Sequence, residues 1–212
     1  MSDDISAASG ERKNSNENAS QKKKNQFWEI IKFTVIALVI VIPVRLFIAQ
    51  PFIVSGESMV PTFHHGDYLI IDEISYRFHD PQRGDVVVFR YPLQQDRFFI
   101  KRVIGLPLET VEIQDDVITI TNTDEPDGFE LDEPYLDAMD TRGTVTRVLD
   151  ENEYFVMGDN RMASSDSREW GALDKEFIVG RAWLRLLPLQ DIDFLPGHFE
   201  HEEDYQSHNA DA

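Results

Sequence analysis

Beyond Val54 the sequence alternates apolar and polar residues with a period of two, and this alternation limits the fold more than any other feature. Such a period places successive side chains on opposite faces of an extended strand. Turn signals such as Arg83-Gly84 and Gly158-Asp159 separate the alternating segments, and no helical period competes with them. The pattern therefore predicts an all-β domain, a folded or partly closed barrel. The predicted strands are residues 67–72, 85–90, 97–103, 110–113, 117–121, 153–157 and 177–187.

Composition divides the chain into four segments. Residues 1–26 are polar and rich in Ser, Asn, Lys and Glu, which predicts a disordered cytoplasmic tail. Residues 27–50 are mostly apolar and are expected to form a transmembrane anchor, followed by the β domain over residues 51–190. Within that domain, residues 122–147 are acidic and irregular, and we expect them to form a surface excursion. Residues 191–212 are predicted to be a mobile acidic tail.

The anchor is predicted from an uncharged run over residues 33–44, flanked by Lys32 and Arg45. This run is shorter than the ~20 apolar residues of a usual span, but both flanking side chains can snorkel to the interfaces. A cleavable secretory signal would need a small-x-small cleavage site, which is missing, and a buried soluble helix would need partners for both charges. Basic residues before the span predict a single-pass protein with a cytoplasmic N-terminus. The β domain is then extracytoplasmic or periplasmic, at the cell (inner) membrane.

Charge and cysteine content exclude several function classes. The chain has no cysteine, which excludes disulfides, thiolate catalysis and zinc sites built on cysteine. Residues 1–54 hold 7 basic and 5 acidic side chains, whereas residues 55–212 hold 13 basic and 34 acidic ones. Because phosphate contacts drive nucleic-acid binding, a domain this acidic is not expected to bind nucleic acid.

Two short segments contain candidate catalytic residues. Residues 55–62 read Ser-Gly-Glu-Ser-Met-Val-Pro-Thr and offer Ser58 in a bend, and residues 98–104 place Lys101 among apolar neighbours. Burial favours the uncharged amine, and a neutral amine within reach of a hydroxyl can take its proton. The pattern alone leaves two alternatives open: the serine can simply satisfy a turn, and the lysine can face solvent on the other side of its strand.

These segments, with residues 83–89 and 157–168, follow the order found in the type I signal peptidase (leader peptidase) family. The chain resembles that family from about Arg45 to Pro188, and the resemblance implies a signal-peptidase-like β fold. It also implies a membrane-bound serine endopeptidase that removes signal peptides from exported preproteins. Ser58 would be the nucleophile and Lys101 the general base, with no metal and no cofactor. We expect the protein to be a monomer whose partners are these preproteins and the lipid bilayer.

The same resemblance assigns supporting roles. Ser164 would hydrogen-bond the lysine amine and orient it. Gly56 stands where some family members carry a serine that helps bind the oxyanion, so its backbone N–H is a candidate second donor beside the N–H of Ser58. Four further residues are expected to form ion pairs that hold the walls of the site: Arg102, Asp159, Asp166 and Arg168.

Motif matching also predicts two small apolar pockets for the small residues one and three positions before the cut. The first pocket would be lined by Met59, Phe63, Phe99 and Ile100. The second would be lined by Phe52, Val54, Leu69, Val88 and Ile100. Each of these residues could equally be ordinary core.

Rival functions remain open at this stage. A Ser-His-Asp arrangement could combine Ser58 with a nearby histidine and aspartate, although the spacing of these residues does not require it. The candidates are His64, His65, Asp67 and Asp85. A Ser/Lys autoprotease of the SOS-repressor type would share the dyad but should carry a helix-turn-helix before it. An inactive membrane-tethered docking module would not need to keep both dyad residues. His198 and His201 in the tail are a weak candidate for metal binding.

Overall fold

The computed structural model describes residues 28–39, 41, 49–136, 141 and 143–197. The chain divides into two compact units, Met1–Phe47 and Ile48–Ala212. In the first unit residues 28–39 are helical and expose apolar side chains, including Trp28 and Val39. No helix within the described ranges has the length and apolar character that crossing a bilayer requires. Residues 42–48 of the predicted anchor lie outside the described residues.

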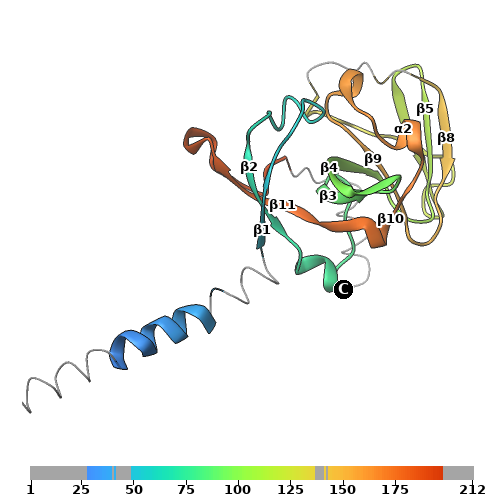
Figure 1. Cartoon of the computed structure of the whole chain (residues 1–212). Coiled ribbons are helices and arrows are strands. Elements are labelled where there is room, and N and C mark those ends of the chain that lie inside the picture. Colours follow the sequence, from blue (N-terminus) through green and yellow to red (C-terminus); the bar gives the residue numbers. More distant parts are fainter. Residues whose placement is uncertain (1–27, 40, 42–48, 137–140, 142, 198–212) are drawn as a thin grey trace, which may run out of the picture. The chain divides into compact units, whose positions relative to one another are not determined.

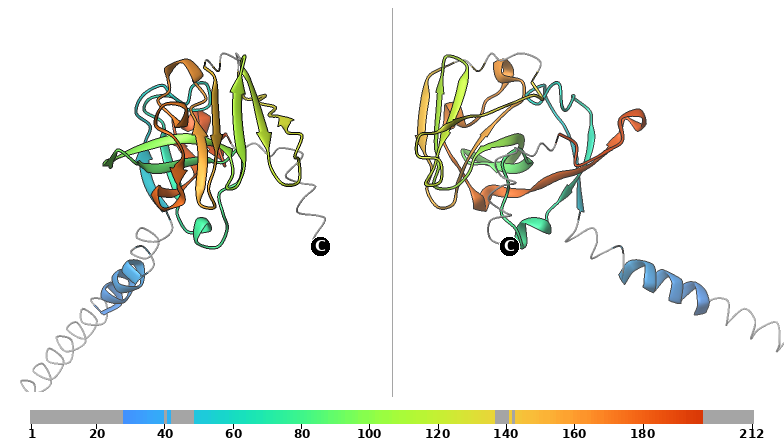
Figure 2. Two further views of the ribbon diagram at one scale, coloured as in Figure 1. Left: turned by 90° about the vertical axis from the view of Figure 1, so that its right-hand side faces the viewer. Right: turned by 180° about the vertical axis from the view of Figure 1, so that it is seen from behind.

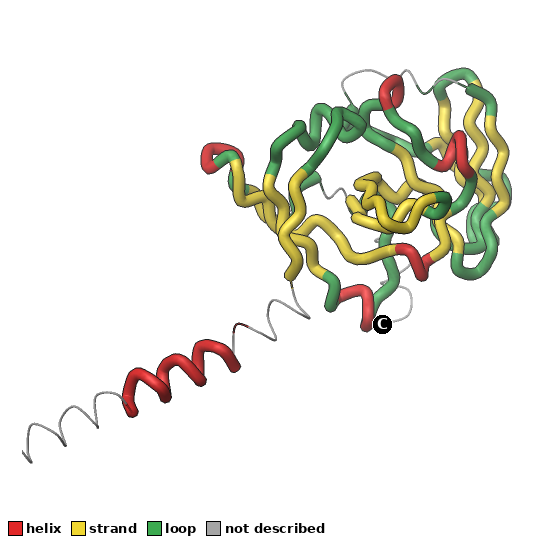
Figure 3. The backbone as a smooth tube through the Cα atoms, viewed as in Figure 1, coloured by secondary structure: helices red, strands yellow, loops and turns green. Residues whose placement is uncertain are grey.

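The second unit contains a large antiparallel sheet and a smaller one (Figures 1 and 3). The large sheet has the order β1-β2-β11-β3-β4-β9-β10, with β12 paired to β11. Among the described residues β1 and β10 are its two edges, so strand pairing does not close it into a full barrel. Its strands are β1 (Ala49–Ile53), β2 (Tyr68–Asp72), β3 (Val86–Tyr91), β4 (Gln94–Gly105), β9 (Glu153–Met157), β10 (Leu173–Asp174), β11 (Ile178–Leu187) and β12 (Asp193–Phe194).

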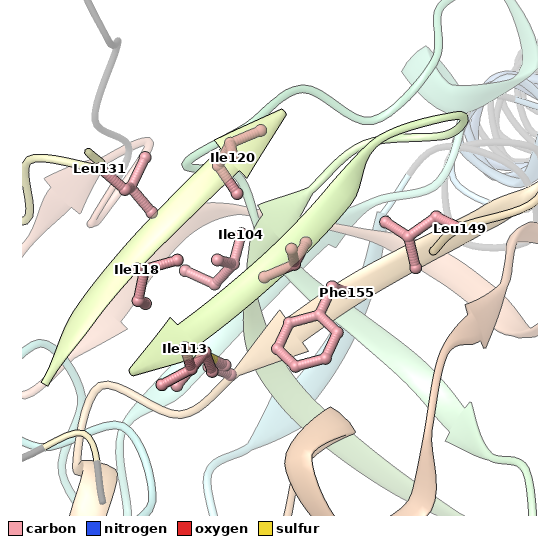
Figure 4. Close-up of a cluster of buried hydrophobic side chains, with 9 residues drawn as sticks. Ile104, Ile113, Ile118, Ile120, Leu131, Leu149 and Phe155 are labelled. Atoms are coloured by element: carbon pink, nitrogen blue, oxygen red, sulfur yellow. The ribbon is translucent and has the colours of Figure 1, made fainter. Parts of the chain in front are cut away.

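The smaller sheet has the order β7-β6-β5-β8 and forms a blade on one side of the unit (Figures 1 and 2). Its strands are β5 (Thr110–Gln114), β6 (Val117–Thr121), β7 (Phe129–Glu130) and β8 (Val145–Val148). Alternation explains how it packs: Val111 and Ile113 of β5 are buried, whereas Glu112 between them is exposed. Figure 4 shows the resulting core, in which Ile113 and Ile118 meet Phe155 of the large sheet. The two sheets therefore share one hydrophobic core.

Two further clusters of buried side chains lie within the large sheet. One joins Val54, Met59 and Phe63 to the inner face of β2 and β3. The other is built around Phe89 and Tyr154. The first cluster matters most for function, because it holds the chain between β1 and β2 against the sheet.

All seven predicted strands are present, and the mostly β architecture is confirmed. Three parts of the prediction were wrong. The last two residues of the predicted anchor begin β1, so the anchor cannot extend to residue 50. Residues 122–147 are more than a surface excursion, because they contain β7 and the start of β8, and Leu131 is buried in the shared core. Residues 191–197 of the predicted tail are ordered through β12, which pairs with β11, whereas residues 198–212 lie outside the described residues.

Candidate active site

A cavity of about 310 Å³ lies between β1, the loop that follows it and the middle of β4. Its polar lining includes Ser58, from the loop after β1, and Lys101, from β4. Its apolar lining contains six of the predicted pocket residues: Phe52, Val54, Leu69, Val88, Phe99 and Ile100. The lining residues run from Phe52 to Ser165, so the cavity brings together residues that are up to 113 positions apart in the sequence.

Ser58 is carried by residues 54–66, the serine loop. Two backbone hydrogen bonds close its base: Val54 N–H donates to Asp67 O and Gly66 N–H donates to Val54 O, each at 2.9 Å. Gly56 has φ +98°, a left-handed conformation that glycine adopts without the steric cost of a Cβ. Met59 and Phe63 are 1% and 0% exposed and fix the loop to the core beneath it. Ser58 itself is half-buried and faces the cavity.

Lys101 lies in β4 opposite Val87 and is only 3% exposed. The alternative that its side chain faces solvent is therefore wrong. Its Nζ is 2.7 Å from Ser58 Oγ and donates to Ile100 O at 2.8 Å. Desolvation by burial lowers the pKa of Lys101 from 10.5 to about 8, while the carboxylates of Asp166 and Asp159 raise that pKa and so oppose part of the shift.

The protonation state of Lys101 decides the direction of its contact with Ser58. As an ammonium group it donates to the hydroxyl oxygen. As a neutral amine it has a lone pair that accepts the Ser58 O–H proton. The geometry therefore fits a base and its hydroxyl, and the lowered pKa brings the neutral form within reach of physiological pH.

The expected ion pairs are formed. Arg102 Nε and Nη2 donate to the two carboxylate oxygens of Asp159 at 2.9 and 2.6 Å, with both side chains fully buried. Arg168 Nε is 2.8 Å from Asp166 Oδ1, and Asp166 Oδ2 also accepts from Gly158 N–H at 3.1 Å. Asp166 caps the short helix α2 (Ser167–Trp170) by accepting from the Arg168 N–H. The first pair links β4 to the segment that follows β9, and the second lies within that segment.

The expected hydrogen bond from Ser164 to Lys101 is not formed. Ser164 Oγ is buried and has no hydrogen-bond partner among the described residues. The Lys101 amine contacts Ser58 Oγ and Ile100 O instead. Ser164 nevertheless lies close by, because a Cβ placed on Gly158 would overlap both Ser164 Oγ and the Ser58 carbonyl oxygen. The glycine thus allows the two segments to approach each other.

Met59 and Phe63 were predicted to line the first pocket, and this was wrong. Both belong to the buried cluster under the serine loop and are absent from the described cavity lining. The turn closed by the Phe63 N–H to Met59 O bond, at 2.8 Å, holds the two residues together within that core. They position the loop and do not contact the cavity.

The histidines of the serine loop lie in exposed positions. His65 Nδ1 accepts from the Gly56 N–H at 3.3 Å, so this N–H is already bonded and does not support the idea of a second oxyanion donor. Neither His64 nor His65 contacts Ser58 among the described hydrogen bonds. The Ser-His-Asp arrangement therefore has no geometric support in the described part of the chain.

Several residues of the site were not predicted. Ile53, Arg97 and Ser165 also line the cavity. Thr62 donates to Asp159 Oδ2, and Arg185 Nη1 donates to Thr62 O at 2.9 Å. The motif that contains Ser58 also contains Thr62, so the sequence could have indicated that residue. No local signal distinguishes Arg185 from the other charged residues of its strand.

Comparison with known proteins shows which family this chain belongs to. Residues 27–187 match the family described as signal peptidase, peptidase S26. A probable signal peptidase I-1 of Synechocystis sp. is 39% identical over 173 residues, covering 76% of this chain and 85% of the relative. A signal peptidase I of Bacillus licheniformis is 33% identical over 187 residues, covering 83% and 97%.

A solved signal peptidase I from Enterococcus faecalis V583 also matches part of this chain. It aligns with a TM-score of 0.42 at 32% identity, covering 49% of this chain and 97% of that one. The family match covers most of the chain, and it includes both Ser58 and Lys101. This chain therefore belongs to the signal peptidase family, peptidase S26.

Proposed function

We propose that this protein is a membrane-bound signal peptidase I that cleaves N-terminal signal peptides from exported preproteins, with Ser58 as nucleophile and neutral Lys101 as general base. The observation that carries the proposal is the 2.7 Å contact between a buried amine and a hydroxyl inside an apolar cavity. Membership of the signal peptidase family supports the same reaction.

In the proposed reaction Ser58 Oγ attacks the scissile carbonyl carbon while its proton passes to Lys101 Nζ. The tetrahedral intermediate collapses, the C–N bond breaks, and the resulting ammonium gives its proton to the leaving amine. Water then attacks the acyl-enzyme, again losing a proton to Lys101. The Ser58–acyl bond breaks to release the signal peptide, and Lys101 returns the proton to Ser58 Oγ. The Ser58 N–H is the proposed oxyanion donor.

The environment of Lys101 supplies the neutral amine that this reaction needs. With a pKa of about 8, roughly one molecule in ten holds the neutral form at pH 7. A peptide that fills the cavity would remove further water from the amine and increase that fraction. Arginine could not serve here because its guanidinium stays charged.

The cavity also supports the proposed substrate class. Its apolar walls suit small uncharged side chains, and bulky walls exclude larger ones, although one methylene discriminates by only ~1–3 kcal/mol. β1 is an edge strand, and its residues face the cavity together with residues 97–101 of β4. An extended substrate could therefore add its backbone to the edge of the sheet.

Membrane attachment is part of the proposal. Its support is the uncharged run over residues 33–44 and the exposed apolar side chains of the helix at 28–39. The proposed anchor ends before β1 at Ala49. We propose a cytoplasmic N-terminus, an extracytoplasmic β unit and a monomeric enzyme that needs no metal or cofactor.

The test is cleavage of a synthetic precursor peptide by the full chain in detergent. Ser58→Ala and Lys101→Ala should each reduce cleavage by at least ~10³-fold, as expected for loss of a nucleophile or its base. Their circular dichroism spectra should match that of the wild type. Cleavage at the wild-type rate by either variant contradicts the dyad, and no cleavage by the wild type favours a docking module.

A further inference from the structure

Arg185 of β11 connects the serine loop to the turn before β12. Its side chain is 17% exposed, and its Nη1 donates to the carbonyl oxygen of Thr62 at 2.9 Å. The same Nη1 is 3.6 Å from Asp67 Oδ2, at the base of the loop. On its other side, Nε donates to Asp191 O at 2.8 Å. One guanidinium thus bonds to two segments that are far apart in the sequence.

Thr62 is held on two sides. Its carbonyl accepts from Arg185, and its hydroxyl donates to Asp159, which Arg102 binds through two hydrogen bonds. The guanidinium of Arg185 also lies 5.6 Å from the centre of the Phe63 ring, which is itself completely buried. Ser58 precedes Thr62 by only four residues, so these contacts set where the serine can lie.

The two groups of the proposed dyad are supported in different ways. Lys101 is part of a paired strand, because Val87 faces it across the β3–β4 ladder. Ser58 is in a loop without strand pairing, and its position depends on the backbone bond from Asn160 N–H to Ser58 O and on side-chain contacts of the loop. A displacement of ~1 Å in a reacting group can cost ~100-fold in rate even when the altered residue does not touch substrate.

We propose that Arg185 is a positioning residue that holds Ser58 Oγ at hydrogen-bond distance from Lys101 Nζ by fixing the serine loop at Thr62. This inference rests on the proposed role of Ser58 as nucleophile. Only an arginine suits the position, because its planar fork donates to Thr62 O and Asp191 O at once. The family match ends at residue 187, so Asp191 lies outside the matched region.

The test compares Arg185→Gln with a matched control, Arg181→Gln, in the full chain. Arg181 lies on the same strand and is 3.7 Å from Asp72 and 4.0 Å from Asp85, so its removal also breaks ion pairs but leaves the serine loop untouched. With a synthetic precursor peptide, we expect R185Q to lower kcat by ~10–100-fold with KM changed by less than about threefold. R181Q should keep the wild-type kcat. Equal kcat values for the two variants, or a change confined to KM, would overturn the proposal.

Arg185→Lys provides a second variant. It keeps a charge near Asp67 but cannot supply two donors in one plane, so we expect it to recover kcat by no more than a few fold over R185Q. Recovery of the full wild-type kcat by this variant would show that charge alone is needed and would overturn the positioning role. If R185Q does not fold, R185K carries the comparison with R181Q.

Amide hydrogen exchange tests the proposal without any substrate. The Phe63 N–H, bonded to Met59 O in the serine loop, should exchange ~10-fold faster in R185Q and at the wild-type rate in R181Q. Unchanged exchange in R185Q would overturn the inference. Should the wild type cleave no precursor peptide, the proposed function is wrong, and the exchange rates still decide whether Arg185 holds the loop.

Discussion

At the scale of single residues, the chemistry depends on the cost of burying one charge. Lys101 is almost completely buried, and its contacts are a hydroxyl, a carbonyl and the Phe99 ring, whose centre is 5.5 Å from Nζ. No carboxylate touches Nζ among the described ion pairs, and the attraction of Asp166 and Asp159 only partly offsets desolvation. The site therefore holds a lysine that is easier to deprotonate than a free one.

The pH dependence of activity follows from that lowered pKa. Because the base must be neutral, kcat/KM for a precursor peptide should rise about tenfold per pH unit below pH 8 and level off above it. Between pH 8 and 10.5 the folded chain also binds fewer protons than the unfolded chain at this residue, so its contribution to stability rises with pH in that window. A kcat/KM that does not change between pH 6 and 10 would contradict the account.

The buried pair of Arg102 and Asp159 gives a second prediction. Asp159→Asn leaves a fully buried guanidinium without its counter-charge, which should lower the free energy of unfolding by about 3–5 kcal/mol. Urea unfolding of the full chain measures this. The matched control is Asp80→Asn, which breaks an exposed pair with Lys175 and should cost less than about 1 kcal/mol. Similar losses in both variants would show that burial does not determine how much breaking each ion pair costs in free energy of unfolding.

Prediction of single residues from the sequence succeeded where a motif carried the information and failed where a side-chain direction was needed. The motifs identified Ser58 and Lys101 together as candidate catalytic residues, and the structure places them in contact. The same motifs could not reveal that Met59 and Phe63 turn into the core, or that Ser164 Oγ has no partner. Those features depend on how the loop packs against the rest of the protein, and the local sequence does not determine that packing.

At the scale of elements, the site depends on the close approach of the serine loop to the segment after β9. Asn160 N–H donates to Ser58 O at 3.0 Å, and Gly158 lies against both Ser58 O and Ser164. Gly158→Ala would push against a backbone oxygen, which cannot move away without shifting Ser58. We predict a fall in kcat of ~10-fold or more from this displacement, measured by peptide cleavage. A variant with wild-type kcat would show that the contact between Gly158 and the serine loop tolerates a methyl group.

Elements with strong alternation were predictable and short or atypical ones were not. The alternation is clear in β2, β5 and β6, where buried residues alternate with more exposed ones. β1 was missed because its apolar residues continue the hydrophobic stretch before it, so composition alone placed the boundary too late. β7 and β8 were missed because acidic residues around them suggested a solvated loop, whereas pairing with β6 and β5 orders them.

At the scale of the whole molecule, the chain separates a small N-terminal unit from a β unit that contains all the described strands and all three core clusters. We therefore predict that residues 48–212 fold without residues 1–47 and cleave a soluble precursor peptide with the kcat of the full chain. Cooperative urea unfolding and peptide cleavage would test this. An unfolded or inactive fragment would show that the first unit contributes to the site.

The central claim is that burial lowers the pKa of Lys101 to about 8, because the buried ammonium loses its hydration, so that part of the protein holds the neutral amine near pH 7. The most direct test is an NMR titration of the Lys101 side chain in the full chain in detergent, with Lys101→Ala used to assign the signal. The account predicts a titration midpoint near pH 8. A side chain that stays fully protonated to pH ~10 or above, close to the value for free lysine, would contradict it.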